Sequence, residues 1–172
     1  LPAGAAGHAL FFGGKPMDFL CSGICGMLVG FVSQFLGRWK ANPFFSTIAS
    51  AFFMAMLTYA MGAAGLPINP DVVNIGALMI LVPGLLFTNA MRDIIYGDTN
   101  SGINRIVQVL LVAAAIVLGT ASAWNVASYL WGTPVSTAGI PYSMVAQCLF
   151  AFVGCIGFAI QFNIHGFGVS LC

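Results

Sequence analysis

The fold of this chain is decided by a stretch without any charge, residues 19–37, which read FLCSGICGMLVGFVSQFLG. Asp18 precedes this stretch and Arg38 follows it. A helix needs about 20 mostly apolar residues to cross the roughly 30 Å hydrocarbon core of a bilayer, and the stretch meets that requirement. Its apolar run is continuous and lacks the alternation of a membrane β-strand. We therefore predict a transmembrane helix here.

Similar windows recur along the chain. Residues 41–70 and 72–91 carry no charge, and no Asp, Glu, Lys or Arg occurs from Ile106 to Cys172. Glycines and prolines at 132–141 divide this last stretch into two. The pattern predicts an all-α membrane protein, a polytopic transmembrane helix bundle of about six segments. The first is partial and ends near Gly13, and the others span 17–36, 43–64, 73–95, 101–124 and 142–164, the fifth with Ser101 as its N-cap.

The overall composition excludes several functional classes. Of the 172 residues, 60% are hydrophobic and 5% are charged, whereas soluble domains usually carry about 25% charged residues. A formal net charge of +1 excludes a polybasic nucleic-acid binder and an acidic tail. The chain has no His-Glu-x-x-His motif, and its four acidic residues are all aspartates. We expect no enzyme activity, no catalytic residues and no cofactor.

Neither the cysteines nor the histidines form a metal-binding motif. Five cysteines and two histidines are dispersed over the chain: Cys21, Cys25, Cys148, Cys155, Cys172, His8 and His165. A zinc site needs several thiolates with histidine support at ligand spacing, which none of these residues has nearby in sequence. We expect no metal, and we interpret the cysteines as small packing residues and the histidines as packing or interfacial residues.

The ends of the chain indicate part of a longer protein. Leu1–Phe12 reads as the second half of a helix whose start is missing, and the C-terminus carries no charged anchor.

A short internal sequence similarity favours a structural repeat. Residues 7–13 and 157–163 share Gly, Ala and Phe at a constant offset of 150. The two copies lie on the first and sixth predicted segments, which point in opposite directions. This arrangement is typical of a transporter built from inverted repeats.

The cations are concentrated on one side of the predicted bundle. Arg38 and Lys40 lie in one loop, Arg92 and Arg105 flank another on the same side, and the opposite side has only Lys15. Cytoplasmic loops carry an excess of Lys and Arg. The ratio predicts that loops 38–42 and 92–105 are cytoplasmic and that loops 65–70 and 132–141 are outside.

The densest polar region surrounds a proline in the predicted fourth segment. Pro83 has no amide hydrogen and clashes with the preceding turn, and Gly84 lets the freed backbone bend. Unpaired backbone inside a membrane must meet protein or water, so the break, which frees the Met79 carbonyl, indicates a polar cavity shared with the fifth segment. The candidate residues for substrate binding or translocation are Pro83, Gly84, Thr88, Asn89, Arg92, Asp93, Asn104, Arg105 and Gln108.

Charge and spacing give some of these residues candidate roles. A zwitterionic amino acid needs a cation for its carboxylate and an anion or carbonyl oxygens for its ammonium group. We expect Arg92 to hold the carboxylate and the freed carbonyls to suit the ammonium group. Asp93 lies about 100° round the helix from Arg92, so we expect Asp93 to pair with Arg105 on the next helix.

Simpler roles stay open for the same residues. Arg92, Asp93 and Arg105 fall near the cytoplasmic ends of their helices, where they could be topology anchors that reach the interface. Asn89 and Gln108 could join neighbouring helices by hydrogen bonds. The proline break could be a passive kink.

The polar region resembles the central motif of the threonine/serine exporter family. The matching residues are the run 81–93, which reads LVPGLLFTNAMRD, followed by Gly97-Asp98, Ser101-Gly102 and Arg105. Companion motifs are Phe11-Phe12-Gly13-Gly14 with Asp18, Asn42-Pro43-Phe44, and Gly157-Phe158-Ala159 followed by Phe162-Asn163. The similarity covers nearly the whole chain.

The resemblance implies two related five-helix membrane halves, here fused on one chain, that export threonine and serine across the plasma membrane of the bacterial inner-membrane type. In this plan residues 1–124 are the first membrane module, without its N-terminal cytoplasmic domain, residues 125–141 are a linker, and residues 142–172 are the start of the second membrane module. The implied driving force is the proton motive force. The implied partners are a small-molecule substrate, protons, the lipid bilayer and the remaining helices of the second half. No nucleic-acid partner is expected, and a homo-oligomer is left open. Where many relatives have a glutamate this chain has Gln108, which carries no proton, so proton coupling would run elsewhere, through Asp93.

Two other functions stay open. The first is a dicarboxylate (succinate-like) exporter of the same family, in which Arg92 and Arg105 hold the two carboxylates. The second is a membrane scaffold or assembly subunit that transports nothing. Thermal stabilisation by substrate separates them, because a scaffold gains nothing from serine or succinate.

Overall fold

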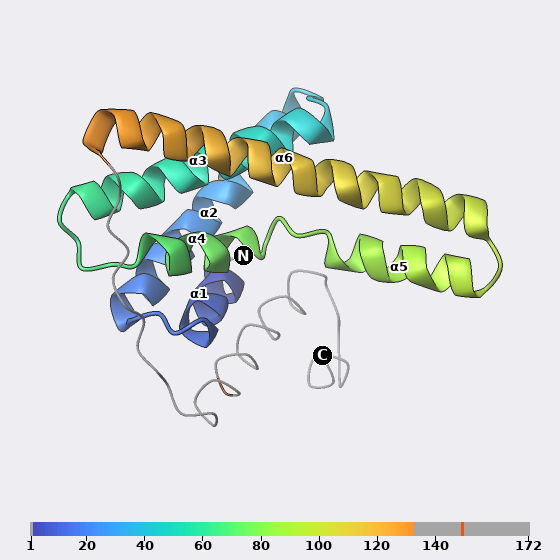
Figure 1. Cartoon of the computed structure of the whole chain (residues 1–172), viewed down its shortest axis with the longest axis horizontal. Coiled ribbons are helices and arrows are strands. Elements are labelled where there is room, and N and C mark those ends of the chain that lie inside the picture. Colours follow the sequence, from blue (N-terminus) through green and yellow to red (C-terminus); the bar gives the residue numbers. More distant parts are fainter. Residues whose placement is uncertain (1, 133–148, 150–172) are drawn as a thin grey trace.

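The computed structural model describes residues 2–132 and Leu149 (Figure 1). Six helices occupy most of this part: α1 (Pro2–Phe11), α2 (Pro16–Arg38), α3 (Pro43–Ala63), α4 (Pro70–Leu78), α5 (Gly84–Ile95) and α6 (Thr99–Trp131). Every regular element in the described part is a helix, which confirms the predicted all-α bundle. The predicted segment 142–164, apart from Leu149, lies outside the described residues, as do the expected linker and loop from residue 133 onward.

Three of the helices are long and apolar enough to cross a bilayer. They are α2, α3 and α6, with 23, 21 and 33 residues. Large apolar side chains are exposed on all three, among them Phe31, Phe53 and Val117. A soluble protein rarely exposes so much apolar surface, whereas lipid-facing helices do so along their whole length. The chain is a helical membrane protein.

A proline is the first residue of four helices, α1, α2, α3 and α4. Pro16, Pro43 and Pro70 each stand at the start of a helix, where the missing amide hydrogen costs nothing. Two of these starts are capped by an asparagine side chain. Asn42 accepts a hydrogen bond from the Phe44 amide at 2.9 Å, and Asn69 accepts one from the Asp71 amide at 3.2 Å.

The predicted fourth segment, 73–95, is divided into two short helices. α4 has 9 residues and α5 has 12, and neither is long enough to span a bilayer alone. Pro83 has φ −82° and ψ 54°, and the Gly84 amide donates to the Val82 carbonyl at 2.9 Å. This geometry is an inverse γ-turn, which redirects the chain just before α5. The predicted break at Pro83–Gly84 is confirmed, and it begins four residues earlier than expected, at Met79.

The fifth segment is longer than the predicted 101–124. α6 begins at Thr99 and continues to Trp131, so the first residues of the expected linker, 125–131, are helical. The prediction that Ser101 is the N-cap is wrong. Asp98 occupies that position, and its carboxylate accepts a hydrogen bond from the Ser101 amide at 3.4 Å. Asp serves this role because its short carboxylate reaches the amides of the first turn.

The interior is built from small and medium apolar side chains. One core cluster joins α2, α3, α4 and the loop that precedes α4. Its buried residues are Cys21, Cys25, Val29, Met54, Ile68, Val73 and Ala77. Cys21 and Cys25 are buried in this cluster as free thiols, outside any disulfide, which confirms their predicted packing role. A second contact joins α3 to α6 through a stripe of small residues on α6: Ala115, Gly119, Ala123 and Ala127.

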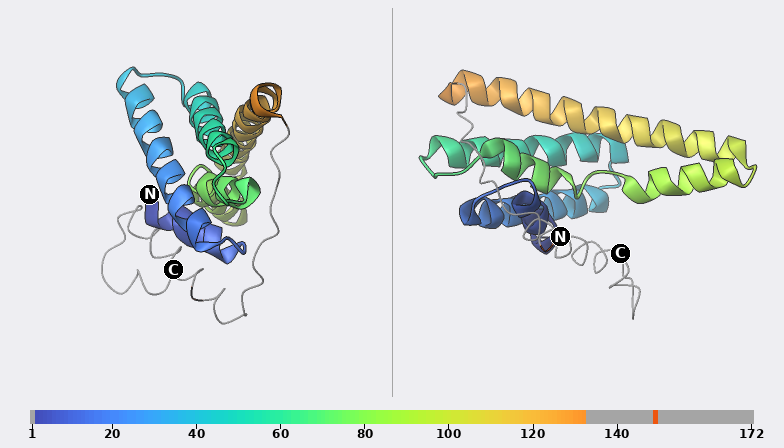
Figure 2. Two further views of the ribbon diagram at one scale, coloured as in Figure 1. Left: turned by 90° about the vertical axis from the view of Figure 1, so that its left-hand side faces the viewer. Right: turned by 60° about the horizontal axis from the view of Figure 1, so that its bottom comes forward.

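The helices form a bundle from which one hairpin projects. α1 packs on α2 and α4, and α3 packs on α6, whereas α5 makes its main contacts with α6 alone. Figures 1 and 2 show α5 and the first half of α6 extending beyond the other helices. The α2–α3 turn and the α5–α6 turn point toward the same end of the bundle, and the α3–α4 turn points toward the other. This arrangement agrees with the expectation that loops 38–42 and 92–105 share one side.

Candidate functional site

The break between α4 and α5 leaves backbone acceptors without helical partners. The last amides before the break donate to carbonyls only three residues earlier. Ile80 donates to the Ala77 carbonyl at 3.3 Å and Leu81 to the Leu78 carbonyl at 2.8 Å. In the described part of the chain no backbone amide donates to the carbonyls of Met79, Ile80 or Leu81. The expected unpaired carbonyl at Met79 is therefore present, together with two more.

A close helix contact builds the hairpin that follows the break. Ala90 is the buried residue of α5, and Gly102 of α6 lies against it. A Cβ at Gly102 would stand 2.9 Å from the Ala90 carbonyl oxygen and would collide with the Ile94 side chain. Only glycine permits this approach, which brings the polar side chains near the turn within reach of one another.

Asp93 is the centre of the charged group in this hairpin. Its Oδ2 lies 3.2 Å from Arg105 Nη1 and accepts a hydrogen bond from Ser101 Oγ at 3.4 Å. Side chains on a helix point toward its N-terminus, so Arg105 reaches back along α6 to Asp93. The expected pairing of Asp93 with Arg105 is confirmed.

Arg92 differs from Arg105 in how much of its guanidinium is engaged. Its Nη2 lies 3.7 Å from Asp93 Oδ1, so the long side chain curls back despite the angle of about 100° between the two positions. The side chain of Arg92 is 63% exposed, against 37% for Arg105 and 14% for Asp93. Most of the Arg92 donors are therefore available to another group.

Helical spacing places most of the polar residues on one flank of the hairpin. We call this surface the polar flank: Asn89, Arg92, Asp93, Ser101, Asn104, Arg105 and Gln108. Because Asp93 of α5 and Arg105 of α6 form an ion pair, the polar residues of both helices lie on the same side of the hairpin. The opposite flank carries apolar residues, Phe87, Met91 and Ile94 on α5 and Ile103, Ile106 and Leu110 on α6.

The other candidate residues lie apart from this group. Thr88 points away from α6, and its hydroxyl donates to the Gly84 carbonyl at 3.0 Å. Pro83 and Gly84 lie at the far end of α5, roughly 13 Å along the helix from Asp93. The break and the charged group therefore mark two ends of one helix, and the polar cavity expected between them stays a prediction.

The sequence analysis missed the structural role of Asp18. Asp18 is fully buried in the first turn of α2. Its carboxylate accepts a hydrogen bond from the Lys15 amide at 2.7 Å and another from the Asn69 amide at 2.8 Å. The carboxylate thus ties the start of α2 to the start of α4. Pro16 followed two residues later by an acid was the available signal, since both residues favour the first turn of a helix.

Asn74 was also missed, and it lies closer to the break. Its side chain, in the middle of α4, is only 8% exposed and lies close to the Tyr59 hydroxyl of α3. Its Oδ1 has no hydrogen-bond partner among the described residues. A buried acceptor left unpaired costs about 1–3 kcal/mol, so the position favours an additional donor such as water or substrate. The signal was an amide side chain inside the charge-free window 72–91.

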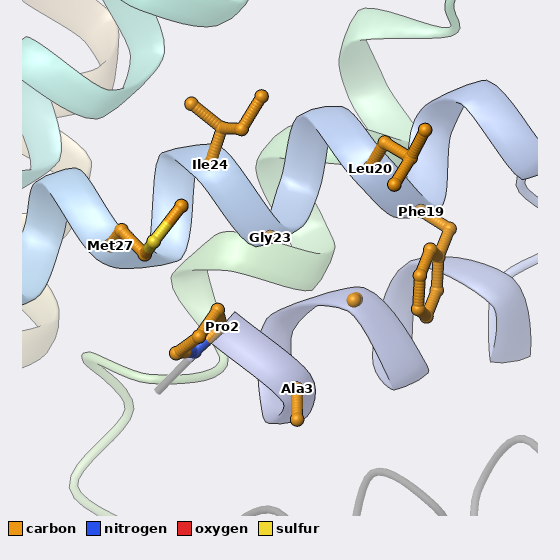
Figure 3. A pocket seen from close by; sticks show the side chains of 8 residues that line it. Pro2, Ala3, Phe19, Leu20, Gly23, Ile24 and Met27 are labelled. Atoms are coloured by element: carbon orange, nitrogen blue, oxygen red, sulfur yellow. The ribbon is translucent and has the colours of Figure 1, made fainter.

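A groove between α1 and α2 has a different character. It measures about 370 Å³ and is shown in Figure 3. It is lined by Pro2, Ala3, Ala6, Phe19, Leu20, Gly23, Ile24 and Met27. None of these side chains offers a hydrogen bond, so the groove does not suit a small polar substrate.

Comparison with models of known protein families gives a match over most of the described bundle. The family model described as "Putative threonine/serine exporter" matches residues 3–127. The match runs from α1 into the last turns of α6 and includes the break and the polar flank. No curated protein and no solved structure matches the chain.

Proposed function

The chain belongs to the threonine/serine exporter family, and from this membership we propose that it exports threonine and serine across the plasma membrane, driven by the proton motive force. The observation that carries the proposal is the broken span joined to a hairpin with one polar flank. Exporters need polar groups inside the membrane, and broken helices are where transporters place them.

The two ends of the proposed site suit the two charges of an amino acid. Arg92 has donors to spare and would hold the carboxylate from the hairpin end. The unpaired carbonyls of Met79, Ile80 and Leu81 would accept hydrogen bonds from the ammonium group at the break. Asn74 Oδ1, which also has no hydrogen-bond donor, would accept a hydrogen bond from a hydroxyl or ammonium group of the substrate. The distance along α5 means that one substrate would meet these groups in succession.

The ion pair within the hairpin favours an amino acid over a dicarboxylate. A dicarboxylate exporter would use both Arg92 and Arg105, one for each carboxylate. Arg105 is already engaged with Asp93 at 3.2 Å, so the hairpin offers only one guanidinium that is largely free. A substrate with a single carboxylate matches that supply.

Asp93 is the group that we assign to proton coupling. Gln108 cannot carry a proton, and Asp93 is the carboxylate of the polar flank. Protonation of Asp93 would cancel its charge and release Arg105 and Arg92 from the ion pair. The proton and the substrate would therefore act on the same side chains.

The polar flank also indicates that further helices pack against this hairpin. Arg92, Asn104 and Gln108 are exposed, and such groups are costly against hydrocarbon. We infer that the remaining helices of the second membrane half cover this flank and enclose the path between them and α5–α6.

Efflux from liposomes tests the proposed function. The full-length protein is reconstituted with labelled threonine, serine or succinate inside, and efflux is followed with and without an imposed proton gradient. We expect gradient-dependent efflux of threonine and serine and little efflux of succinate. Preferential succinate efflux would overturn the substrate assignment in favour of the dicarboxylate alternative. No efflux, combined with no thermal stabilisation by any of the three, would identify a scaffold instead.

A further inference from the structure

The last two turns of α2 carry a hollow that the proposed transport function does not use. It measures about 140 Å³ and is lined by Phe31, Gln34, Phe35 and Arg38. The spacing of these residues, i, i+3, i+4 and i+7, places them on one face of the helix. The face lies at the end of α2 that meets the α2–α3 turn, away from the polar flank of the hairpin.

Aromatic rings line this face in a continuous row. Phe31 and Phe35 stack with ring centroids 6.4 Å apart, and Trp39 continues the row at 5.7 Å from Phe35. The rings are turned outward, since Phe31 is 68% exposed and Trp39 is 76% exposed. A tryptophan at the end of a spanning helix is typical of the level where hydrocarbon meets headgroups.

Two cations without acidic partners stand at the end of this row. Neither Arg38 nor Lys40 forms an ion pair with any residue in the described part of the chain. Lys40 has a φ of +53°, and its amide donates to the Gly37 carbonyl at 3.1 Å, which ends the helix and holds Lys40 beside Arg38. The turn therefore presents two positive charges without an acidic partner among the described residues.

The depth of Gln34 distinguishes this face from a simple pair of anchoring cations. Asp18 and Arg38 are separated by twenty residues of α2, about 30 Å, which equals the hydrocarbon thickness. Gln34 lies one turn, roughly 6 Å, below Arg38, yet this polar residue is exposed. An exposed amide at that depth is unfavourable unless a polar group reaches down to it.

We propose that this face of α2 is a binding site for an anionic phospholipid. The phosphate would accept hydrogen bonds from the Arg38 guanidinium and the Gln34 amide, with Lys40 supplying a second positive charge. The acyl chain would lie along Phe31 and Phe35. Charge complementarity favours an anionic lipid over a zwitterionic one, because its headgroup brings a negative charge without a cation of its own to a turn that carries two cations.

Thermal unfolding in defined lipid tests this proposal. The full-length protein in nanodiscs of phosphatidylcholine is compared with nanodiscs containing phosphatidylglycerol, and native mass spectrometry counts retained lipid. We expect phosphatidylglycerol to raise the melting temperature by roughly 2–4 °C and to be retained. Inorganic phosphate alone should give no shift, and a shift with phosphate would overturn the assignment to a lipid.

Variants separate a shaped site from general charge attraction. Arg38→Gln and Lys40→Gln should each lose most of the phosphatidylglycerol effect, and Lys15→Gln, a cation at the other end of α2, should keep it. Gln34→Leu is the decisive change, because it retains both cations and makes α2 more apolar. We expect Gln34→Leu to lose the preference for the anionic lipid. An undiminished preference in this variant would show that the cations are ordinary topology anchors.

Discussion

At the scale of single residues, two neighbouring positions of α5 have different surroundings. Asp93 is mostly buried and engaged with Arg105 and Ser101, whereas Arg92 is mostly exposed and holds only a longer contact to Asp93. The helix rotates by about 100° between successive residues, so one side chain faces α6 and the next faces outward. This difference separates the group that fixes the hairpin from the group that would meet substrate.

The first prediction concerns Arg92. Arg92→Lys should reduce threonine efflux about tenfold or more, since a point charge replaces a guanidinium that binds a carboxylate through two hydrogen bonds, each worth about 1.5–3 kcal/mol. Initial efflux rates from liposomes at equal protein content measure the change. Lys15→Arg, an exchange of the same two residue types at a distant site, is the matched control and should transport normally. Full transport by Arg92→Ala would show that Arg92 is only an anchor.

The second prediction concerns the Asp93–Arg105 pair. Asp93→Asn and Arg105→Gln should each reduce transport, because each leaves the other charge without its partner in a medium of low polarity. The double variant should lose less than the sum of the two single effects, by about 0.5–3 kcal/mol. A double-mutant cycle on efflux rates measures this coupling. Strictly additive losses would mean that the two side chains act independently.

At the scale of the elements, the break between α4 and α5 is produced locally. Pro83 removes one amide donor, and the inverse γ-turn around it is closed by the Gly84 amide. The unpaired carbonyls that result are a consequence of the sequence over five residues, and they need no tertiary contact to form. What surrounds them depends on the rest of the bundle.

The third prediction tests whether this break is needed. Pro83→Ala restores an amide that can donate to the Met79 carbonyl, so the two helices should join and transport should fall severalfold. Pro43→Ala is the control, because Pro43 starts α3, where no helical bond is missing. Hydrogen exchange at residues 79–85 reports the added helix, and efflux reports the function. Increased protection there with unchanged efflux would make the break a passive kink.

The fourth prediction concerns the contact of α6 with α3. A Cβ at Gly119 would stand 2.6 Å from the Ile48 carbonyl oxygen and 2.8 Å from the Ala51 Cβ, so the helices would have to separate. Gly119→Val should therefore destabilise the protein by about 1–3 kcal/mol. Gly37→Ala has open space around the added atom and should be neutral or slightly stabilising. Thermal melts in detergent compare the two, and an equal loss in both would contradict the tight α3–α6 contact.

At the scale of the whole molecule, two turns rich in cations share one end of the bundle. Arg38 and Lys40 lie at the α2–α3 turn, and Arg92 and Arg105 lie near the α5–α6 turn. The α5–α6 hairpin reaches further than the other helices at that end (Figure 2). The charge distribution therefore predicts one cytoplasmic side for both turns.

The fifth prediction is this orientation, tested by cysteine labelling from the outside in a variant that lacks the five native cysteines. Single cysteines at Lys40 and Gly97 should stay unmodified in intact cells, and one at Leu66 should be modified. Leu66 is the better outer position because Ile68, in the same loop, is only 2% exposed. Modification at position 40 but not at position 66 would show that the topology is the reverse of the predicted one.

Local patterns were sufficient for several features of this protein. Charge-free windows predicted the spans because hydrophobic length alone decides whether a helix suits the bilayer. Pro83 predicted the break, and the spacing of Asp93 and Arg105 predicted an ion pair, since both effects act within or between adjacent helices. The N-cap of α6 was misplaced by three residues because Asp98 and Ser101 are both good caps and the turn at Gly97 decides between them.

Tertiary structure alone decided the roles that depend on distant contacts. The sequence analysis gave Asp18 no structural role, because nothing near it in sequence reveals Asn69, whose amide it binds 51 positions away. Asn74 looked like one more polar residue in an apolar window until α3 placed Tyr59 beside it and left its carbonyl oxygen unpaired. Sequence determines which segments enter the membrane, because the hydrophobicity of a segment's own residues decides whether it is stable in lipid. Which polar groups are satisfied there depends on neighbours that only the packed helices bring together.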